Sequence, residues 1–326
     1  MRVLVTGGAG YVGSVSVRSL LDAGHEVVVL DTLERGHRWA VDDRADFVVG
    51  DVGDLEAVRE AVCCVDAVLH CAGYIDVAES VREPERYFEN NTEKPRVLLD
   101  EMRAAGVDAL VFSSTAAVYG EPEEVPIPED APLRPVSPYG ESKRRFEEAL
   151  AAAEAEWGLR WAALRYFNVA GATPDGTLGE AHDPETHIIP RVLGAILYGD
   201  PEFTVFGSDY PTADGTCVRD YIHVCDLADA HRRALEHLAK GGDSLACNLG
   251  TGRGWSNLEV VRTCSEVTGA DVRVVFGPRR EGDPAMLVAK PGRAERTLGW
   301  TPRRSDLVTI VEDAWRWESK GRHAVT

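Results

Sequence analysis

A tyrosine and a lysine four residues apart are the first candidates for chemistry in this sequence. Tyr139 and Lys143 lie in the segment S-P-Y-G-E-S-K and share one face if that segment is helical. A phenol, with a pKa of about 10, is a poor base at neutral pH, but an adjacent ammonium favours the phenolate. Thr115 ends the run F-S-S-T and can share a proton with that phenolate. These three residues predict a proton-transfer site.

A glycine-rich loop near the N-terminus gives this site a context. Residues 6–13 read T-G-G-A-G-Y-V-G between a strand-like run and a helix-like run, and Gly8, Gly10 and Gly13 fit G-x-G-x-x-G. Such glycines let backbone N–H groups approach a pyrophosphate at a helix N-terminus. Asp31 lies 18 residues beyond Gly13, where a carboxylate binds ribose hydroxyls and repels a 2′-phosphate. The loop therefore predicts NAD rather than NADP, with a ligand-free turn as the alternative.

The spacing of Tyr139 and Lys143 is by itself more typical of a solvated helix surface than of a catalytic site. Two features of the sequence reverse that weighting. The pair follows a dinucleotide loop, and it also follows a strand that ends in Ser-Ser-Thr. We therefore keep Thr115, Tyr139 and Lys143 as the predicted catalytic residues.

Alternating apolar and helix-like stretches surround these residues in the first half of the chain. The strand-like runs are apolar on both faces, as in a parallel sheet covered by helices; they are 3–5, 26–30, 46–49, 67–70, 109–112 and 162–165. The helices expected between them are 11–23, 54–62, 84–105 and 138–157. This order predicts an α/β fold with a doubly wound parallel sheet, the Rossmann fold.

The second half of the chain is less regular. Six prolines between 121 and 138 predict an extended surface loop, and strict alternation fades after Gly171. The expected elements are helices 188–198, 226–238, 257–268 and 305–317 and strands 203–206 and 272–276. We predict an NAD-binding domain over residues 1–170, to which residues 217–250 return, and a smaller C-terminal α/β substrate lobe over 171–326.

Composition excludes several other classes of function. The 326 residues include 35 Lys and Arg against 54 Asp and Glu, a net charge of −19, which disfavours binding to nucleic acid or to an anionic membrane. No apolar run approaches the length of about 18 residues that a membrane span needs, and no signal peptide is recognisable. Seven scattered cysteines without a C-x-x-C motif predict neither disulfides nor a metal site. A cytoplasmic protein is expected.

Longer motifs resemble the extended short-chain dehydrogenase/reductases, and among them the UDP-glucose 4-epimerases. They are T-G-G-A-G-Y-V-G, F-S-S-T-A-A-V-Y-G, S-P-Y-G-E-S-K, R-Y-F-N-V-A-G-A, V-F-G-S-D-Y-P-T-A-D-G-T-C-V-R-D-Y-I-H-V-C-D-L-A-D-A-H and P-R-R-E-G-D. The resemblance covers nearly the whole chain. It implies an NAD-dependent isomerase that interconverts UDP-galactose and UDP-glucose by reversible hydride transfer from C4 through a 4-keto intermediate.

The same resemblance assigns roles to individual residues. It makes Tyr139 the catalytic base and acid, Lys143 its electrostatic partner and Thr115 the assisting hydroxyl. The cofactor residues implied are Gly7, Gly10, Tyr11, Val12, Gly13, Asp31, Asp51, Val52, Cys71, Ala72, Gly73, Asn91, Tyr139, Lys143 and Tyr166. The substrate residues implied are Thr115, Tyr139, Asn168, Ile188, Phe206, Arg219, Arg280 and Asp283.

Within the UDP group, the resemblance assigns Asn168, Arg219 and Arg280 to the diphosphate, Asp283 to the uridine ribose and Phe206 to uracil. Two arginines from distant segments suit a dianionic diphosphate in so acidic a protein. Ordinary ion pairs are the alternative, because acidic residues adjoin both arginines in the sequence. Asp51 could bind the adenine amino group of the cofactor, with the role of a turn residue or helix cap after the third strand as the alternative.

Other members of the resembling family provide rival functions. A nucleotide-sugar 4,6-dehydratase carries an Asp-Glu pair after the catalytic hydroxyl, whereas this chain has Ala116 and Ala117, which transfer no protons. A UDP-glucuronate decarboxylase and a 4-epimerase of UDP-N-acetylglucosamine or UDP-glucuronate keep the same three catalytic residues. A non-catalytic sensor of NAD and UDP-sugar is the rival from another class, and the intact triad argues against it.

The sequence departs from the family pattern in three places. Tyr74-Ile75 replaces Leu-Lys, which removes a cation from the cofactor phosphates. Thr92-Glu93-Lys94-Pro95 replaces a run of small residues, and Pro95 is expected to bend its helix. Leu287 aligns with a bulky tyrosine of some members, so the hexose pocket is expected to admit a 2-acetamido sugar. The resemblance also implies a homodimer through helices 84–105 and 138–157.

Overall fold

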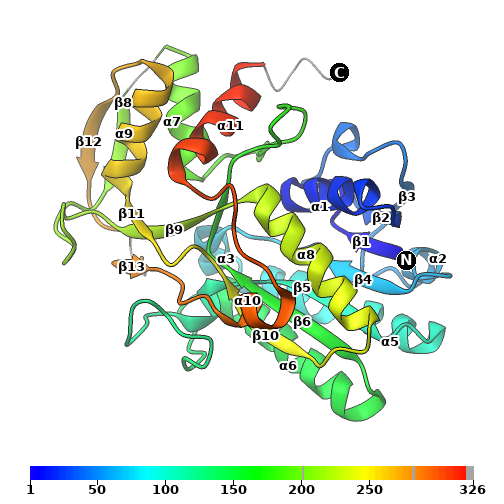
Figure 1. Ribbon diagram of the computed structural model, residues 1–326. Helices are drawn as coiled ribbons and strands as arrows, with labels where there is room; N and C mark the ends of the chain where they lie inside the picture. Colours follow the sequence, from blue (N-terminus) through cyan, green and yellow to red (C-terminus); the bar gives the residue numbers. More distant parts are fainter. Residues whose placement is uncertain (200–201, 281–282, 321–326) are drawn as a thin grey trace.

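A parallel seven-stranded sheet forms the centre of the protein (Figure 1). The structure is a computed structural model that describes residues 1–199, 202–280 and 283–320. The strand order is β10-β6-β5-β4-β1-β2-β3, with bounds β1 (Arg2–Thr6), β2 (Glu26–Asp31), β3 (Asp46–Val49), β4 (Ala67–His70), β5 (Ala109–Thr115), β6 (Arg160–Tyr166) and β10 (Leu245–Leu249). Successive strands run outward in both directions from β1 and β4. The predicted doubly wound fold is confirmed.

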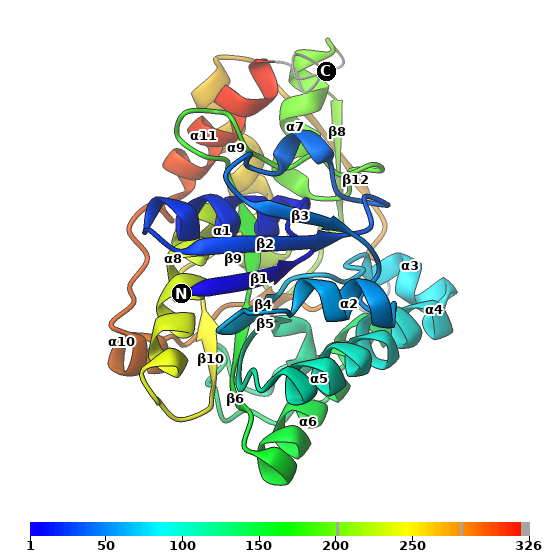
Figure 2. The ribbon, with the colours of Figure 1, turned by 90° about the vertical axis from the view of Figure 1, so that its right-hand side faces the viewer.

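Helices cover both faces of this sheet (Figure 2). On one face α1 (Tyr11–Asp22) and α8 (Val224–Ala239) bury Val17 and Leu227 in a core cluster with Val3 and Val5 of β1. On the other face, α2 (Leu55–Ala61), α5 (Lys94–Ala105) and α6 (Pro138–Trp157) pack in a cluster with Leu4. Side chains of β1 thus alternate between two apolar layers, which is why its sequence is apolar throughout.

Helix α6 forms where the sequence predicted it because both of its ends are capped. The Ser137 hydroxyl accepts a hydrogen bond from the N–H of Gly140 at 3.2 Å, and Pro138 occupies the first turn, where a missing N–H costs nothing. Gly158 ends the helix with a left-handed φ of 83°. These caps place Tyr139 and Lys143 in its first turns.

The helix predicted over 84–105 is present, and it contains a π-helical turn. It runs through α4 (Pro84–Phe88), the π-helical turn η2 (Glu89–Glu93) and α5, and the short helix α3 (Val77–Arg82) precedes it. Pro95 lies in the first turn of α5, where it needs no hydrogen-bond acceptor. Pro95 was expected to bend its helix, and the structure shows a wider, π-helical turn directly before α5 instead.

The second lobe lies beyond the carboxyl ends of the main sheet. Its four-stranded sheet consists of β7 (Asn168–Ala170), β9 (Val218–His223), β11 (Gly254–Ser256) and β13 (Met286–Leu287), and a parallel pair consists of β8 (Glu202–Phe206) and β12 (Arg273–Gly277). Its helices are α7 (Ile188–Leu197), α9 (Asn257–Thr268) and α11 (Leu307–Ser319), while α10 (Arg293–Leu298) packs against α8 and β10. Short 3-10 turns η1 (Arg38–Ala40) and η3 (Ala116–Tyr119) complete the elements.

Residues 217–250, which were predicted to return to the first domain, contribute elements to both lobes. Helix α8 and strand β10 lie in the main sheet layers, whereas β9 belongs to the sheet of the second lobe. Ala294, Leu298 and Trp300, which the sequence assigned to the substrate lobe, join the core of the main sheet. We propose that the chain therefore crosses between the two lobes more often than the sequence indicated.

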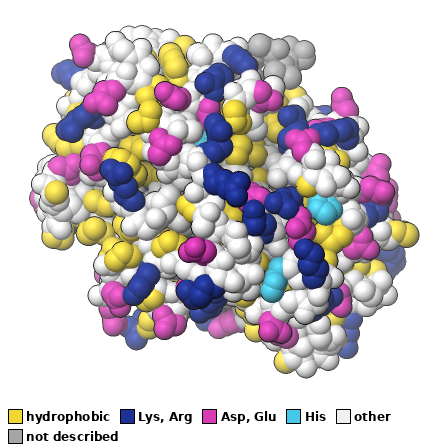
Figure 3. Space-filling view, in the orientation of Figure 1, with side chains coloured by type: hydrophobic (Ala, Val, Ile, Leu, Met, Phe, Trp, Pro, Cys, Tyr) yellow, Lys and Arg dark blue, Asp and Glu magenta, His cyan; other side chains and the backbone are white. Residues whose placement is uncertain are grey.

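The surface carries both signs of charge. On the face shown in Figure 3, acidic and basic side chains are interspersed. Among the described residues, no helix combines the length and apolar character that crossing a membrane requires.

Candidate active site

The predicted catalytic residues meet at the carboxyl edge of the parallel sheet. Thr115 is the last residue of β5, Tyr166 is the last residue of β6, and Cys71 directly follows β4. Tyr139 and Lys143 enter the same region from the start of α6. Doubly wound folds bind ligands at this edge, near the point where the strand order reverses.

Thr115 and Tyr139 lie together in a buried position. The Thr115 hydroxyl accepts a hydrogen bond from the N–H of Ala117 at 3.1 Å, which orients the hydroxyl. Burial raises the pKa of Tyr139, and its hydrogen bond with Thr115 acts in the opposite direction. Tyr139 is thus a phenol in the protein alone, so proton removal needs a further positive charge beside it.

Lys143 is held by the strand rather than by the phenol. Its Nζ donates to the carbonyl oxygen of Ser113 at 3.1 Å and lies 4.9 Å from the centroid of the Phe112 ring. A Cβ on Gly73 would lie 3.2 Å from this Nζ, so a glycine there leaves room beside the ammonium. Burial lowers the pKa of Lys143 to about 8. Two further N–H groups of the ammonium are free to bind a ligand.

This pKa gives the reaction an alkaline limit. The ammonium loses its proton as the pH rises through about 8, and with it the positive charge that supports the phenolate. We expect kcat to fall on the alkaline side with a midpoint near that pH. Chromatography of quenched UDP-sugar mixtures would give kcat against pH for the parent and for Lys143→Met. The same alkaline fall in the residual activity of the variant would contradict this assignment.

The glycine loop presents unpaired N–H groups at the start of α1. Gly10 is the N-cap, and within the described residues the N–H groups of Tyr11, Val12 and Gly13 have no protein acceptor. A Cβ on Gly10 would meet only the Gly7 oxygen, at 3.4 Å, so the loop is open on that side. These N–H groups at the positive end of a helix fit a pyrophosphate.

Asp31 is oriented by the same loop. Its two carboxylate oxygens accept from the N–H groups of Ala9 at 2.9 Å and of Leu33 at 2.8 Å. Each oxygen keeps a lone pair that can accept from a ribose hydroxyl. The buried, oriented carboxylate fits the adenosine ribose of NAD better than the 2′-phosphate of NADP.

Asp51 has the turn role that the sequence left open, together with an ion pair. Its Oδ1 accepts from the N–H of Gly53 at 2.7 Å, and its Oδ2 lies 2.6 Å from Lys94 Nζ. Lys94 belongs to the segment that departs from the family pattern. An adenine contact by Asp51 stays a prediction, as does a cofactor contact by the neighbouring buried Val52.

The remaining predicted cofactor residues line the space beside Lys143. Asn91 fixes the loop after β4, because its Oδ1 accepts from the N–H of Tyr74 at 2.8 Å and its Nδ2 donates to Ser142 at 3.1 Å. Cys71 accepts a hydrogen bond from Ser113 at 3.1 Å, and burial raises its pKa to about 11, so it is a neutral thiol. Ala72, Gly73 and Tyr166 complete this wall.

The loop that lacks the family lysine is held by other contacts. The side chain of Ile75 is exposed, so it adds no charge to the cleft. The Tyr74 hydroxyl donates to the Glu34 carboxylate at 2.9 Å, and Arg86 donates to the same carboxylate at 3.0 Å. These bonds join the loop after β4 to the loop after β2.

Arginines and aromatic rings gather in the second lobe. The Arg280 guanidinium lies 4.2 Å from the Phe206 ring centroid, at the end of β8. Arg191 on α7 stacks over Phe203 at 5.3 Å, and its pKa is lowered by burial and then by the charge of Arg280. Two cations this close favour an anion between them. The sequence analysis predicted Arg280 and Phe206 but missed Arg191.

Arg219 makes the ion pair that the sequence left open as an alternative. Its guanidinium bonds the carboxylate of Asp283, whereas Asp220 accepts from the backbone of Thr251. Asp283 and Arg219 therefore hold each other in the protein alone, and their separate contacts to ribose and diphosphate stay predictions. Glu281, the other acid considered, lies outside the described residues.

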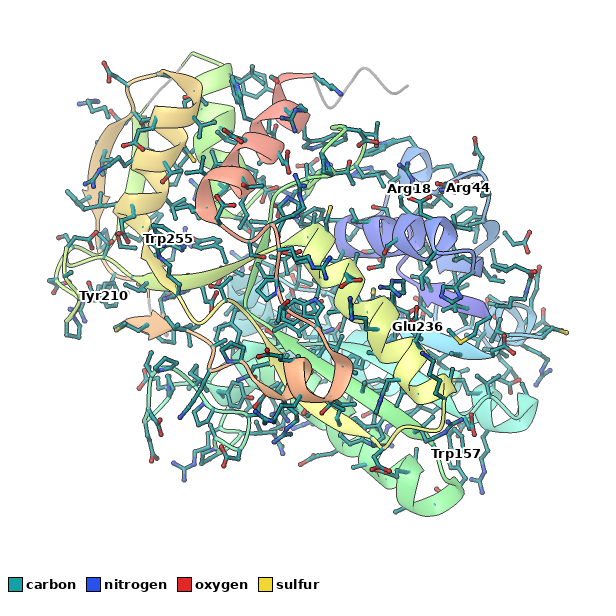
Figure 4. The ribbon with its side chains drawn as sticks, in the orientation of Figure 1. Arg18, Arg44, Trp157, Tyr210, Glu236 and Trp255 are labelled. Carbon is teal, nitrogen blue, oxygen red and sulfur yellow. The ribbon has the colours of Figure 1, made fainter. Side chains whose placement is uncertain are left out.

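Tyr210 was not predicted and lies near this pair. Its hydroxyl is buried with no hydrogen-bond partner among the described residues, and burial raises its pKa to about 12, with Cys217 and Asp283 adding to the shift. Figure 4 places Tyr210 in the second lobe, with Trp255 of β11 nearby. Trp255 pairs with Arg219 across the strand ladder. An orphaned buried hydroxyl is satisfied when a polar ligand binds.

Strand β13 connects the two halves of the site. Leu287 pairs in register with Arg219, and its side chain packs against a cluster that contains Ala116 and Tyr119. Ala116 directly follows Thr115, so the arginine strand lies next to the proton-transfer site. Asn168 begins β7, which pairs with β9, and Ile188 begins α7; their contacts to the substrate stay predictions.

Two glutamates and two histidines form a compact cluster before α7. Glu180, His182, Glu185 and His187 bring their ligand atoms within 4.8 Å of one another. Both histidine Nδ1 atoms lie within hydrogen-bond distance of Glu180 Oε1, at 3.0 Å for His182 and 2.6 Å for His187. The cluster fixes the loop through carboxylate–imidazole bonds, and we assign no metal to it.

The comparison with known proteins identifies the family. The NAD dependent epimerase/dehydratase family matches residues 3–250, which is more than half of the chain. This chain belongs to that family. Among curated members, the UDP-glucose 4-epimerase of Lactobacillus helveticus is 49% identical over 319 residues, or 97% of each chain. The resemblance inferred from the motifs is confirmed.

Solved structures of the epimerase family superpose closely on this one. The UDP-glucose 4-epimerase from Brucella ovis in complex with NAD has a TM-score of 0.93 and 46% identity, and the match covers 96% of this chain and 97% of that chain. The epimerase from Stenotrophomonas maltophila with bound NAD and formylated UDP-arabinopyranose has a TM-score of 0.95 and 40% identity, with 99% and 100% covered. The similarity extends over both lobes.

Proposed function

We propose that this chain is a UDP-glucose 4-epimerase that uses NAD to interconvert UDP-galactose and UDP-glucose. The observation that carries the proposal is the convergence of Thr115, Tyr139 and Lys143 at the carboxyl edge of the parallel sheet. The relatives named above and the NAD and UDP-sugar found in their structures support it. Ala116 and Ala117 provide no acid or base for dehydration.

The cofactor fits the first lobe. The free N–H groups of Tyr11, Val12 and Gly13 would bind its pyrophosphate, Asp31 its adenosine ribose and Lys143 its nicotinamide ribose. NAD supplies a hydride acceptor and donor for C4 of the sugar. The positive charge of its oxidised ring would also favour the phenolate of Tyr139.

The protein residues move the proton. Tyr139 Oη takes the proton of the sugar 4-hydroxyl as the C4 hydride leaves, and Thr115 donates a hydrogen bond that stabilises the phenolate. With NAD bound, the 4-ketose would turn and take back the hydride on its other face, and Tyr139 would return the proton to the oxygen. Tight binding of UDP by Arg280, Phe206 and Arg219 retains an intermediate whose hexose is loosely held.

A substrate panel tests the proposal and separates its rivals. Purified protein would be incubated with UDP-galactose, UDP-N-acetylgalactosamine and UDP-galacturonate, and the products separated by chromatography. Epimerisation of UDP-galactose at C4 is expected. Turnover of only the N-acetylated or the uronic sugar would show that the protein is a 4-epimerase of that UDP-sugar instead. If no product forms although NAD is bound, the remaining candidate function is that of a non-catalytic sensor.

Leu287 favours the N-acetylated sugar as a second substrate. Its aliphatic side chain packs against the cluster that contains Ala116, and we propose that a larger ring there would narrow the space next to the hexose. We expect Leu287→Tyr to lower kcat/KM for UDP-N-acetylgalactosamine about tenfold and that for UDP-galactose much less. Leu287→Met, which conserves volume, is the matched control. Equal ratios of the two activities in Leu287→Tyr and the parent would count against this role.

We further propose that the protein is a homodimer in the cytoplasm. Helices α5 and α6 adjoin on one face of the sheet, and their outer residues, such as Arg96 and Arg145, are exposed. All seven cysteines are free thiols, which suits a reducing compartment. Light scattering should give twice the 35.5 kDa mass of one chain.

A further inference from the structure

A buried ion pair lies directly behind the proton-transfer site. Glu147 of α6 and Arg165 of β6 form a bidentate ion pair. Arg165 Nη2 donates to Glu147 Oε2 at 2.6 Å, and Arg165 Nε donates to Glu147 Oε1 at 3.0 Å. Their side chains are 5% and 7% exposed. We infer that this pair positions the Thr115 hydroxyl against Tyr139, which makes Glu147 and Arg165 positioning residues for the reaction. The inference rests on the proposed function.

Glu147 stands on the same face of α6 as the catalytic residues. Tyr139, Lys143 and Glu147 are spaced at four-residue intervals, which keeps successive side chains within one side of a helix. Glu147 Oε1 also accepts a hydrogen bond from the Ser114 hydroxyl at 2.5 Å. Ser114 immediately precedes Thr115, so one carboxylate links the helix that carries Tyr139 to the strand that carries its partner.

Arg165 holds the other side of Thr115. Its Nη1 donates to the Tyr119 hydroxyl at 3.0 Å and to the Glu129 carbonyl at 3.3 Å. Tyr119 ends the 3-10 turn that begins directly after Thr115, and its hydroxyl donates to Asn248 of β10 at 2.7 Å. Thr115 is thus fixed by the pair on both flanks, through Ser114 and through Tyr119.

A contribution to stability alone does not account for such a pair. Removing two charges from water costs about as much as their attraction returns, so a well-packed apolar pair is often equally stable. An apolar pair, however, makes no directional hydrogen bonds. The planar fork of Arg165 and the two oxygens of Glu147 fix α6, β5 and β6 in one register, and a displacement of about 1 Å at a reacting group can reduce a rate about 100-fold.

The test compares Glu147→Gln and the double variant Glu147→Leu/Arg165→Met with the parent holoenzyme. The double variant avoids a lone buried charge, so it keeps the pair's volume without leaving an arginine unpaired. We expect both to lower kcat for UDP-galactose by about 10- to 100-fold, with KM and the Kd for UDP changed less than about twofold. Asp313→Asn is the matched control, because Asp313 of α11 is a buried carboxylate paired with Arg304, Arg316 and His223, outside the site. It should lower the melting temperature and leave kcat unchanged.

A second readout does not depend on turnover. Ultraviolet difference titration, with Tyr139→Phe variants subtracted, reports ionisation of Tyr139. Loss of the Thr115 hydrogen bond should raise the pKa of Tyr139, whereas simple removal of the Glu147 negative charge should lower it. An upward shift in Glu147→Gln is expected, and a downward or absent shift would overturn the inference. So would a kcat that falls in Asp313→Asn as much as in Glu147→Gln. If the parent itself turns over no UDP-sugar, the proposed function fails and this titration still decides the positioning role.

Discussion

Tyr139→Phe is expected to lower kcat by about 10²- to 10⁴-fold while UDP and NAD still bind. The hydroxyl that the variant lacks is the group that takes and returns the proton in the proposed mechanism, with Thr115 beside it. The ring, which is buried, keeps its packing. The rate is measured by chromatography of UDP-galactose and UDP-glucose under saturating substrate.

The control for this variant is Tyr198→Phe, which removes the hydroxyl of an exposed tyrosine at the end of α7. It should keep the parent rate. Unchanged Kd values for UDP in both variants would show that the loss lies in the chemical step. If the Tyr139→Phe protein kept more than a tenth of the parent kcat, Tyr139 would not be the catalytic acid and base.

Gly10→Ala is expected to weaken cofactor binding, and Gly13→Ala to destabilise the protein itself. A Cβ on Gly10 meets only the Gly7 oxygen at 3.4 Å, so the protein without cofactor should lose no more than about 1 kcal/mol of its unfolding free energy. The methyl group would then occupy the open side of the loop that the pyrophosphate needs, and the Kd for NAD should rise about 100-fold or more. Calorimetry measures both quantities.

At Gly13 the obstacle is the protein itself. A Cβ there would lie 2.0 Å from the Gly7 oxygen, so the backbone must move, and we expect a loss of about 1–3 kcal/mol even without cofactor. Normal NAD affinity in Gly10→Ala would contradict the assignment of this loop. Equal stability of Gly13→Ala and the parent would contradict the packing described for it.

Local signals predicted those parts of the fold whose ends are marked in the sequence. Helices α6 and α9 begin and end at the predicted residues because Ser137, Gly158, Ser256 and Gly269 cap them. Strand β9 was missed because its sequence V-R-D-Y-I-H contains charged residues. Asp220 is buried there because Thr251, Gly252 and Ala289 donate backbone hydrogen bonds to it. These partners are distant in the sequence, so no local sequence pattern identifies them.

The candidate site was predictable to a similar extent. Thr115, Tyr139 and Lys143 were recognisable from motif and spacing, and the structure brings them to one edge of the sheet. Arg191 and Tyr210 were missed because their proximity to Arg280 and Asp283 depends on how the second lobe folds. Glu147 had a signal that was overlooked, since it continues the four-residue spacing of Tyr139 and Lys143.

The fate of the hydrogen on C4 tests the central claim most directly. UDP-galactose with deuterium at C4 would be converted in ordinary water, and the UDP-glucose formed would be analysed by nuclear magnetic resonance and mass spectrometry. Hydride transfer to bound NAD and back predicts that the product keeps its deuterium at C4, with none exchanged into solvent. UDP-glucose that carries solvent hydrogen at C4, or the absence of any UDP-glucose from protein loaded with NAD, would contradict the account.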